Sequence, residues 1–243
     1  MTTETLSIDI ETFSSENLAK SGVYRYAEAP DFKVLLFGCS VNGGPVFVYD
    51  LASGDKLPAE IIDALLDESV LKCAFNASFE RVCLSRYLRD MCLLPPGKFL
   101  SPVGWRCTMI RCAYLGLPLS LANAGVVLGL DKQKLTEGKD LIRFFCLPAK
   151  PSLINEQTNR NGPTADLNRW LQFVEYNRRD VEVEMLRLRG HRIVAHVHDE
   201  VIIEADPEDS VEEICRIMGE CPPWAKGLIL RADGYECKTY RKD

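Results

Sequence analysis

The stretch LSIDIETFSS, residues 6–15, alternates apolar and polar side chains near the start of the chain. This alternation is the period-2 pattern of a β-strand with one buried face. A strand sends residues i and i+2 to the same side, so Asp9 and Glu11 stand about 7 Å apart along the backbone, at about 3.3 Å per residue. Two such carboxylates repel each other unless a cation lies between them. The stretch therefore predicts a strand with either a solvated acidic edge or a cation site.

The bulk composition is that of an ordinary globular protein. Hydrophobic residues make up 47% of the 243 residues and charged residues 26%, which allows a sizeable core in one large domain or two small ones. The net charge of -6 argues against a protein that grips nucleic acid by bulk positive charge, but not against an enzyme that recruits metal ions. The ten cysteines include no C-x-x-C pair, which favours reduced thiols over a zinc site. We find neither a membrane-spanning apolar run nor a signal peptide, so we expect a cytoplasmic protein without a membrane partner.

The order of the predicted elements indicates an α/β domain. Strands at 33–41 and 46–51 are joined by the Asn-Gly turn of NGGP, which is a strong hairpin signal. Further predicted elements are a helix at 58–68, a strand at 70–75, a helix at 78–88 and a mainly helical region at 108–146. Residues 14–30 and 150–166 are expected to be irregular, and a long helix is expected at 164–189 with Thr164 as its N-cap.

The chain changes character near Gly190. Two strands that flank a His-Asp-Glu turn are predicted at 192–205, and an amphipathic helix is predicted at 210–220. The segments GLILRAD and YECKTY read as closing strands. We therefore expect two domains, at residues 1–189 and 190–243.

Three acid-bearing stretches carry the candidate chemistry. The first is the strand pair Asp9 and Glu11, the second is FNASFE, which ends at Glu80, and the third is YNRRD. In YNRRD, Tyr176 and Asp180 are i and i+4, so they share one helical face. Taken singly, each stretch reads more simply as a solvated edge or a helix surface. The nearby Glu182 and Glu184 compete with Asp180 for the same role.

In this order the three stretches resemble the motifs of the DEDD 3′–5′ exonuclease superfamily, and the tyrosine marks its DEDDy branch. More closely, residues 1–189 resemble the proofreading exonuclease domain of phage-type family A DNA polymerases, which are DNA polymerase I-like. The segments that carry this resemblance are LSIDIETFSS, AFNASFERVCLSRYL, LGLPLSLANAGVVLGL, KLTEGKDLIRFFC and YNRRDVEVEM. The resemblance implies an RNase H-like mixed sheet flanked by helices. It also implies a 3′–5′ exodeoxyribonuclease that takes the 3′ end of a single or frayed DNA strand and releases 5′-mononucleotides.

The resemblance further implies a site with two Mg²⁺ ions, for which Mn²⁺ substitutes. Hard ions of this kind prefer carboxylate oxygens, and a pair of them activates water and stabilises the leaving oxygen. Asp9 would bridge the two ions, while Glu11 and Asp180 would complete the shell of the first. Glu80 would serve the second ion through water, and Tyr176 would orient the attacking water. The wider superfamily has Asp at the position of Glu80, which puts that role in doubt.

Two residues of FNASFE are implied DNA contacts, namely Asn76 and Phe79. Asn76 would alternatively support the end of the strand that precedes it. Other replication proteins are further candidate partners. The sequence leaves the oligomeric state open.

The segment VAHVHDEVIIEA resembles the carboxylate motif at the end of the family A polymerase palm, with His198, Asp199 and Glu200 at its tip. We find neither a second palm aspartate nor a fingers helix, and one palm carboxylate cannot hold a two-metal site. We therefore expect a small α+β palm remnant joined by an internal deletion near residues 189–192, without polymerase activity of its own. Two alternatives stay open: a non-catalytic remnant that binds DNA or a replication protein, and one part of a split polymerase.

Overall fold

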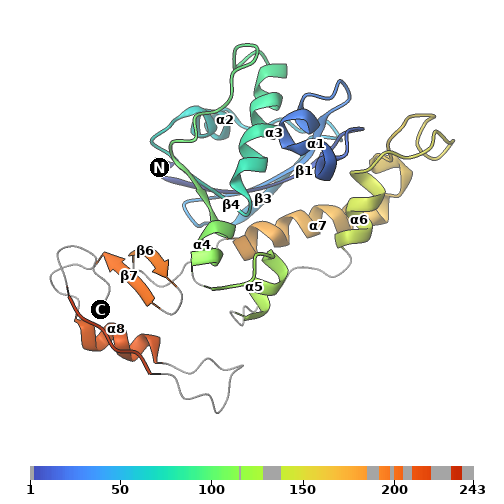
Figure 1. Ribbon diagram of the computed structural model, residues 1–243. Helices are drawn as coiled ribbons and strands as arrows, with labels where there is room; N and C mark the ends of the chain where they lie inside the picture. The colour runs from blue at the N-terminus through green and yellow to red at the C-terminus, as the bar shows by residue number, and fades with distance from the viewer. Residues whose placement is uncertain are drawn as a thin grey trace.

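The computed structural model describes residues 3–114, 116–127, 138–184, 192–197, 200–204, 210–219 and 231–236. Its main body is a five-stranded mixed sheet with helices on both faces (Figure 1). The strands, in spatial order, are β3 (Val46–Asp50), β2 (Lys33–Val41), β1 (Thr5–Phe13), β4 (Leu71–Ala74) and β5 (Trp105–Cys107). β2 runs antiparallel to β1 and β3, whereas β4 and β5 continue the sheet in parallel. The expected RNase H-like sheet flanked by helices is therefore confirmed.

Helices cover the two faces of the sheet unequally. One face packs against α1 (Leu18–Ala27), α2 (Ala59–Leu66) and α3 (Ala77–Asp90), and the other packs against α6 (Gly138–Phe145) and α7 (Leu167–Glu184). Two shorter helices, α4 (Thr108–Tyr114) and α5 (Leu121–Val127), lie below the sheet in Figure 1. Each face of the sheet consequently has its own hydrophobic core.

β1 is the central strand, and it is buried on both sides. Leu6, Ile8 and Ile10 belong to the core under α1, α2 and α3, while Phe13 belongs to the core under α6 and α7. The alternation of the strand therefore turns Asp9 and its i+2 neighbour toward α7. The solvated edge that the sequence allowed is wrong, because β1 is an inner strand between β2 and β4 and Glu11 is buried.

A β-bulge interrupts the pairing of β1 with β2 directly after Glu11. Glu11 pairs with Leu36 and Thr12 pairs with Val34, so that Leu35 is the extra residue on β2. Bulges increase the local twist of a strand and often re-aim side chains next to functional sites. This bulge lies between the acidic pair and the part of β1 that belongs to the core.

The core between the sheet and α7 is built from aromatic rings that pack edge-to-face and face-to-face. The ring of Phe145 lies 4.9 Å from that of Trp170 and 5.2 Å from that of Phe173, and Phe173 stacks on Tyr176 at 6.2 Å. Such pairs contribute about 0.5–1.5 kcal/mol beyond the burial of their area. Phe145 is fully buried, so this stack fixes where α6 and α7 stand relative to β1.

Replacing Phe145 with alanine should therefore lower the free energy of unfolding by about 3–5 kcal/mol, because it leaves a large cavity. Leu153 is 89% exposed, and its replacement by alanine should change that free energy by less than about 0.5 kcal/mol. Urea unfolding of the two variants measures the difference. Equal midpoints would contradict this account of the core.

Three of the expected elements differ from the structure. Residues 14–30 are not irregular, since α1 forms there, with the Asn17 side chain accepting a hydrogen bond from the backbone N–H of Lys20. Only two residues of α1 are buried and Gly22 kinks it, so the helical period in the sequence is weak. The three-residue strand β5 has no clear alternation and was missed. The long helix begins at Leu167 rather than at 164, and Asp166 instead of Thr164 accepts from an N–H of its first turn.

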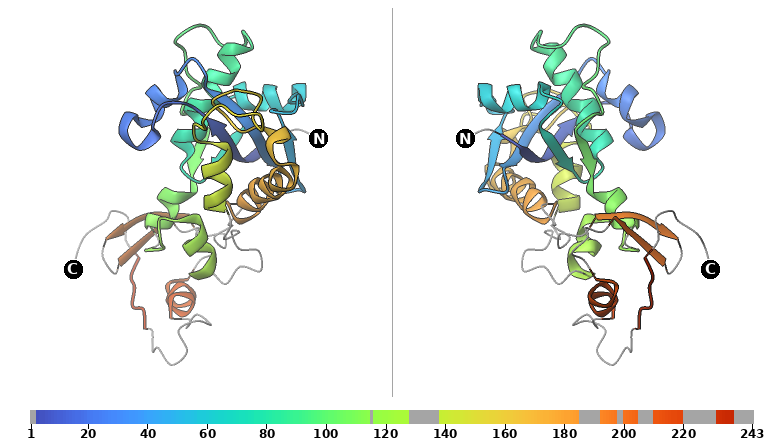
Figure 2. Two further views of the ribbon diagram at one scale, coloured as in Figure 1. Left: turned by 90° about the vertical axis from the view of Figure 1, so that its right-hand side faces the viewer. Right: turned by 90° about the vertical axis from the view of Figure 1, so that its left-hand side faces the viewer.

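The C-terminal segment forms a two-stranded antiparallel sheet of β6 (Arg192–Val197) and β7 (Glu200–Glu204), followed by α8 (Val211–Met218). Figure 2 shows these elements beside, and not within, the five-stranded sheet. The expected hairpin is confirmed; Glu200 opens β7, whereas His198 and Asp199 lie outside the described residues. The expected closing strands are not seen in the part of them that is described, residues 231–236. Among the described residues, no helix is long and apolar enough to cross a membrane.

Candidate metal centre

Three carboxylates from distant parts of the chain meet between β1 and α7. Asp9, Glu11 and Asp180 each place one oxygen within 4.8 Å of the other two. Glu11 and Asp180 are 8% and 2% exposed, and Asp9 is half-buried, so one side of the group opens to solvent. Among the described residues, no other three aspartate, glutamate, histidine or cysteine side chains lie this close together. Glu182 does not join them; it pairs with Arg179.

The charges of this group are unfavourable without a cation. Two unit charges about 4–5 Å apart repel by on the order of 3–4 kcal/mol at an effective dielectric constant of about 20. A divalent cation between the oxygens reverses the sign of that interaction. The donor set consists of carboxylate oxygens, which are the ligands that Mg²⁺ and Mn²⁺ prefer. The residues therefore fit a hard divalent ion.

Tyr176 lies under this group and is 1% exposed. Its pKa is raised far above the ordinary value, first by burial and then by the negative charges of Asp180, Glu11 and Asp9. Its hydroxyl hydrogen-bonds to the Asp180 carboxylate. The tyrosine ring also packs on the backbone of Gly138, where an added Cβ would lie 2.0 Å from a ring carbon. Tyr176 consequently stays a neutral phenol that donates to the acidic group.

Asn177 holds Asp9 and was missed in the sequence analysis. Its Nδ2 donates to Asp9 Oδ2 at 2.7 Å and to the Asp9 backbone carbonyl at 3.2 Å. Gly38 pairs with Asp9 across β1 and β2, and a Cβ at Gly38 would lie 2.4 Å from Asn177 Oδ1. A glycine at this position of β2 is therefore what lets the amide reach Asp9. Nothing in the sequence alone linked Gly38 to YNRRD.

Cys146 contacts the second member of the acidic pair. Its Sγ lies 3.7 Å from Glu11 Oε2 and donates to it. Burial, followed by the charge of Glu11, raises the pKa of this thiol well above its usual range. The thiol therefore remains protonated, and Cys146 forms no disulfide.

The FNASFE residues stand at the carboxyl end of β4, the neighbour of β1. Glu80 lies in the first turn of α3 and is 3% exposed, so it is no surface residue, but it is outside the group of three carboxylates. Asn76 is exposed and has a left-handed backbone with φ of 76°, and its side chain does not cap α3. Phe79 is half-buried and packs on Tyr26 at a ring distance of 6.1 Å.

Comparison with known proteins gives one curated relative. The chain is 47% identical over 181 residues to a DNA polymerase of Bacillus phage SP02. The matched region covers 74% of this chain and 27% of that polymerase. This chain is therefore related to about a quarter of a phage DNA polymerase. No protein-family model matches it.

Solved structures of nucleases are similar at low identity. RNase D of Trypanosoma brucei is 16% identical with a TM-score of 0.47, covering 77% of this chain and 58% of RNase D. NrnC of Brucella melitensis with bound Mg²⁺ is 18% identical with a TM-score of 0.38, covering 55% of this chain and 57% of NrnC.

Proposed function

We propose that this chain is a metal-dependent 3′–5′ exonuclease of the DEDDy type, which removes 5′-mononucleotides from the 3′ end of a single or frayed DNA strand in the cytoplasm. The observation that carries the proposal is the group of three carboxylates whose oxygens lie within 4.8 Å of one another. The relation to a phage DNA polymerase supports DNA as the substrate and replication proteins as further partners. Residues 1–189 would form the exonuclease domain.

Mg²⁺ is the cofactor that the donor set supports best, with Mn²⁺ as a substitute. Asp9, Glu11 and Asp180 would hold the first ion, and Asp9 would also serve the second, together with Glu80 through water. When bound, the two ions supply charge neutralisation at the phosphoryl oxygens, an activated water and a stabilised leaving oxygen.

The remaining residues of the centre would position these ligands and the substrate. Asn177 fixes the orientation of the Asp9 carboxylate with a neutral donor, which leaves the negative charge of Asp9 available to a cation. Tyr176 keeps its proton, so it would orient the attacking water by hydrogen bonding and would not act as a base. Asn76, exposed at the left-handed turn before α3, would contact the DNA, together with Phe79.

A single-stranded oligonucleotide with a label at its 5′ end tests the direction and the metal dependence. The proposal predicts a ladder of labelled products that shorten stepwise from the 3′ end in Mg²⁺, because hydrolysis begins at that end. EDTA should stop the reaction and added Mg²⁺ or Mn²⁺ should restore it. Release of the label as a mononucleotide in the first turnover, or equal trimming in EDTA, would refute the proposed chemistry.

The C-terminal segment at 190–243 is proposed to be a remnant of a polymerase palm, without polymerase activity in this chain. The antiparallel β6–β7 hairpin, with Glu200 as the first residue of its second strand, supports this proposal. Primer extension with all four nucleotides tests this part of the proposal. Templated synthesis by the purified chain would contradict it.

A further inference from the structure

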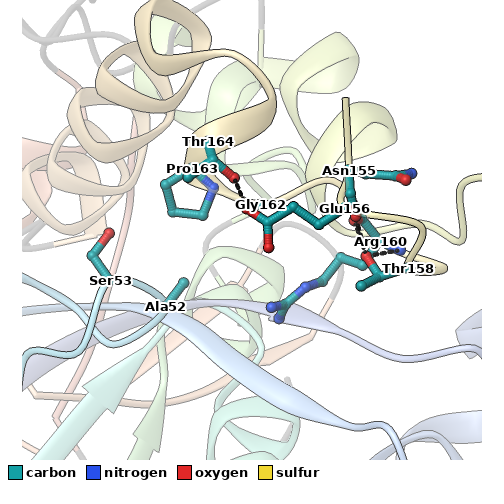
Figure 3. Close-up of a pocket in the computed structure, with 9 residues that line it drawn as sticks. All are labelled: Ala52, Ser53, Asn155, Glu156, Thr158, Arg160, Gly162, Pro163 and Thr164. Carbon is teal, nitrogen blue, oxygen red and sulfur yellow. Dashed lines mark hydrogen bonds between the residues drawn. The ribbon is translucent and has the colours of Figure 1, made fainter. Parts of the chain in front are cut away.

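A cavity of about 440 Å³ lies at the far end of α7 from Asp180. Its walls are the chain after β3 and the loop between α6 and α7, which contributes both Arg160 and Glu156 (Figure 3). The volume falls within the range of about 300–1,000 Å³ that is typical of small-molecule sites. The cavity is separate from the three-carboxylate group, and the function proposed above gives its lining residues no role.

Most polar side chains that line this cavity already donate to protein acceptors. The Ser53 hydroxyl donates to an aspartate at 2.6 Å, and the Thr158 hydroxyl lies 2.7 and 2.8 Å from two backbone carbonyls, between which its one proton is shared. The Thr164 hydroxyl donates to Glu156 at 3.2 Å. The amide of Asn155 donates to a backbone carbonyl at 2.9 Å and to an asparagine side chain at 3.3 Å. None of these side chains therefore has a donor left over for a ligand.

Arg160 is different. Its guanidinium carbon lies 5.7 Å from the centre of the Phe13 ring, and its Nη1 is buried without a hydrogen-bond partner among the described residues. No ion pair joins it to the part of the chain that the structure describes. Burial lowers the pKa of Arg160, and the charge of Asp31 opposes that shift. Asp31 itself is occupied, since it accepts two hydrogen bonds from Ser15 and one from Asn159.

A half-buried cation without a hydrogen-bond acceptor lowers the stability of the fold unless an anion binds to it. The planar fork of a guanidinium matches the paired oxygens of a phosphate. Phe13, which supports this guanidinium, follows Asp9 by four residues on the same face of β1, about 13 Å along the strand at about 3.3 Å per residue. We propose that this cavity binds a phosphate group of a nucleotide or of a nucleic-acid strand, with Arg160 as its ligand.

Glu156 has an exposed carboxylate at the rim of the cavity, so a substitution there tests whether the bound ligand is negatively charged. A negative charge there opposes a bound phosphate, so Glu156→Gln should tighten binding, whereas Arg160→Gln should weaken it. Gln at position 156 can still accept the hydrogen bond from Thr164. A site for a cation or a neutral ligand predicts the opposite, or no change, for the rim substitution.

The experiment uses the full chain in EDTA, so that turnover plays no part and failure of the proposed exonuclease would not affect it. The probe is a labelled oligodeoxythymidylate of about eight nucleotides, a length that suits single-strand sites. Fluorescence anisotropy should show Arg160→Gln binding about 10-fold more weakly. The slope of log affinity against log salt should fall by about 0.7, the value for one lost phosphate contact on a single strand.

Arg25→Gln serves as the control, because it also removes one positive charge but from an exposed ion pair on α1. Arg160→Lys keeps the charge but loses the planar fork, so its affinity should lie between those of the parent and Arg160→Gln; this separates a lost contact from a lost fold. Glu156→Gln should bind about two- to threefold more tightly. Equal binding by Arg160→Gln and Arg25→Gln, or weaker binding by Glu156→Gln, would overturn the proposal.

Competition with small ligands identifies the source of the phosphate. Displacement of the probe by thymidine monophosphate or inorganic phosphate, but not by thymidine, supports a free nucleotide as the ligand. If neither competes while Arg160→Gln still weakens binding of the probe, the phosphodiester of a strand is the ligand. Equal displacement by thymidine and thymidine monophosphate would show recognition of the base and contradict the phosphate assignment.

Discussion

Replacing Asp9 with asparagine should reduce Mg²⁺-dependent trimming of single-stranded DNA by at least about a thousandfold. Asp9 is one of the three carboxylates of the group, and Asn177 fixes its orientation. Losing the charge of a metal ligand removes several kcal/mol of charge stabilisation in the transition state, and about 4 kcal/mol corresponds to about a thousandfold in rate. Initial rates with a labelled strand at saturating Mg²⁺ measure the effect.

Glu182→Gln is the control for this substitution. It removes one carboxylate from the same helix, α7, but from a half-buried ion pair with Arg179 outside the group. Its rate should stay within about threefold of the parent. The Asp9→Asn variant should unfold in EDTA at the same urea concentration as the parent or at a higher one, because repulsion within the group is relieved. Trimming by Asp9→Asn at the parental rate would show that the site is elsewhere.

The second large effect is expected at the contact between Gly38 and Asn177. Asn177→Ala should lower activity or Mg²⁺ affinity by about 10- to 100-fold, the usual loss when the partner of a metal ligand is removed. Gly38→Ala should cause a loss of similar size, because its Cβ would lie 2.4 Å from Asn177 Oδ1 and would push the amide off Asp9. It should also destabilise the fold by about 1–3 kcal/mol, since the Cβ would meet Val181 at 2.9 Å as well.

The double variant distinguishes a shared mechanism from two separate ones. If both substitutions act by releasing Asp9, the double variant should be no more than about threefold less active than Asn177→Ala. Independent effects would multiply instead. Rates measured across a range of Mg²⁺ concentrations, beside urea unfolding of each variant, separate loss of metal affinity from loss of fold. Multiplied losses in a folded double variant would contradict a positioning role for Asn177.

The elements and site residues that could be predicted from the sequence are those with a strong signal in it. The strand carrying Asp9 and Glu11 was expected because alternation is a local pattern, and the Asn-Gly hairpin matched because positive φ at two successive residues leaves few alternatives. Asp180 could be joined to the pair on β1 through the resemblance, and the structure brings the three together. α1 was missed, since a helix that buries two residues carries little period.

Other features of the centre depend on tertiary packing and leave no local trace. The sequence of β2 does not indicate that Gly38 is needed, because the need arises from its contact with Asn177 on α7. Cys146 contacts Glu11 only because α6 ends beside β1. The charged Glu80 next to Arg81 suggested a surface position, yet the side chain is buried where α3 packs on the sheet. Burial of a charged residue is decided by its neighbours in space, which one sequence does not reveal.

The most direct test of the metal centre is anomalous diffraction from a crystal of this chain soaked in Mn²⁺. The account predicts a peak within coordination distance of carboxylate oxygens from Asp9, Glu11 and Asp180, at about 2.0–2.3 Å as for other oxygen-bound divalent ions. The same soak of Asp9→Asn crystals should lose or weaken that peak. Mn²⁺ bound elsewhere on the protein, with these three carboxylates bare at a saturating concentration, would contradict the account.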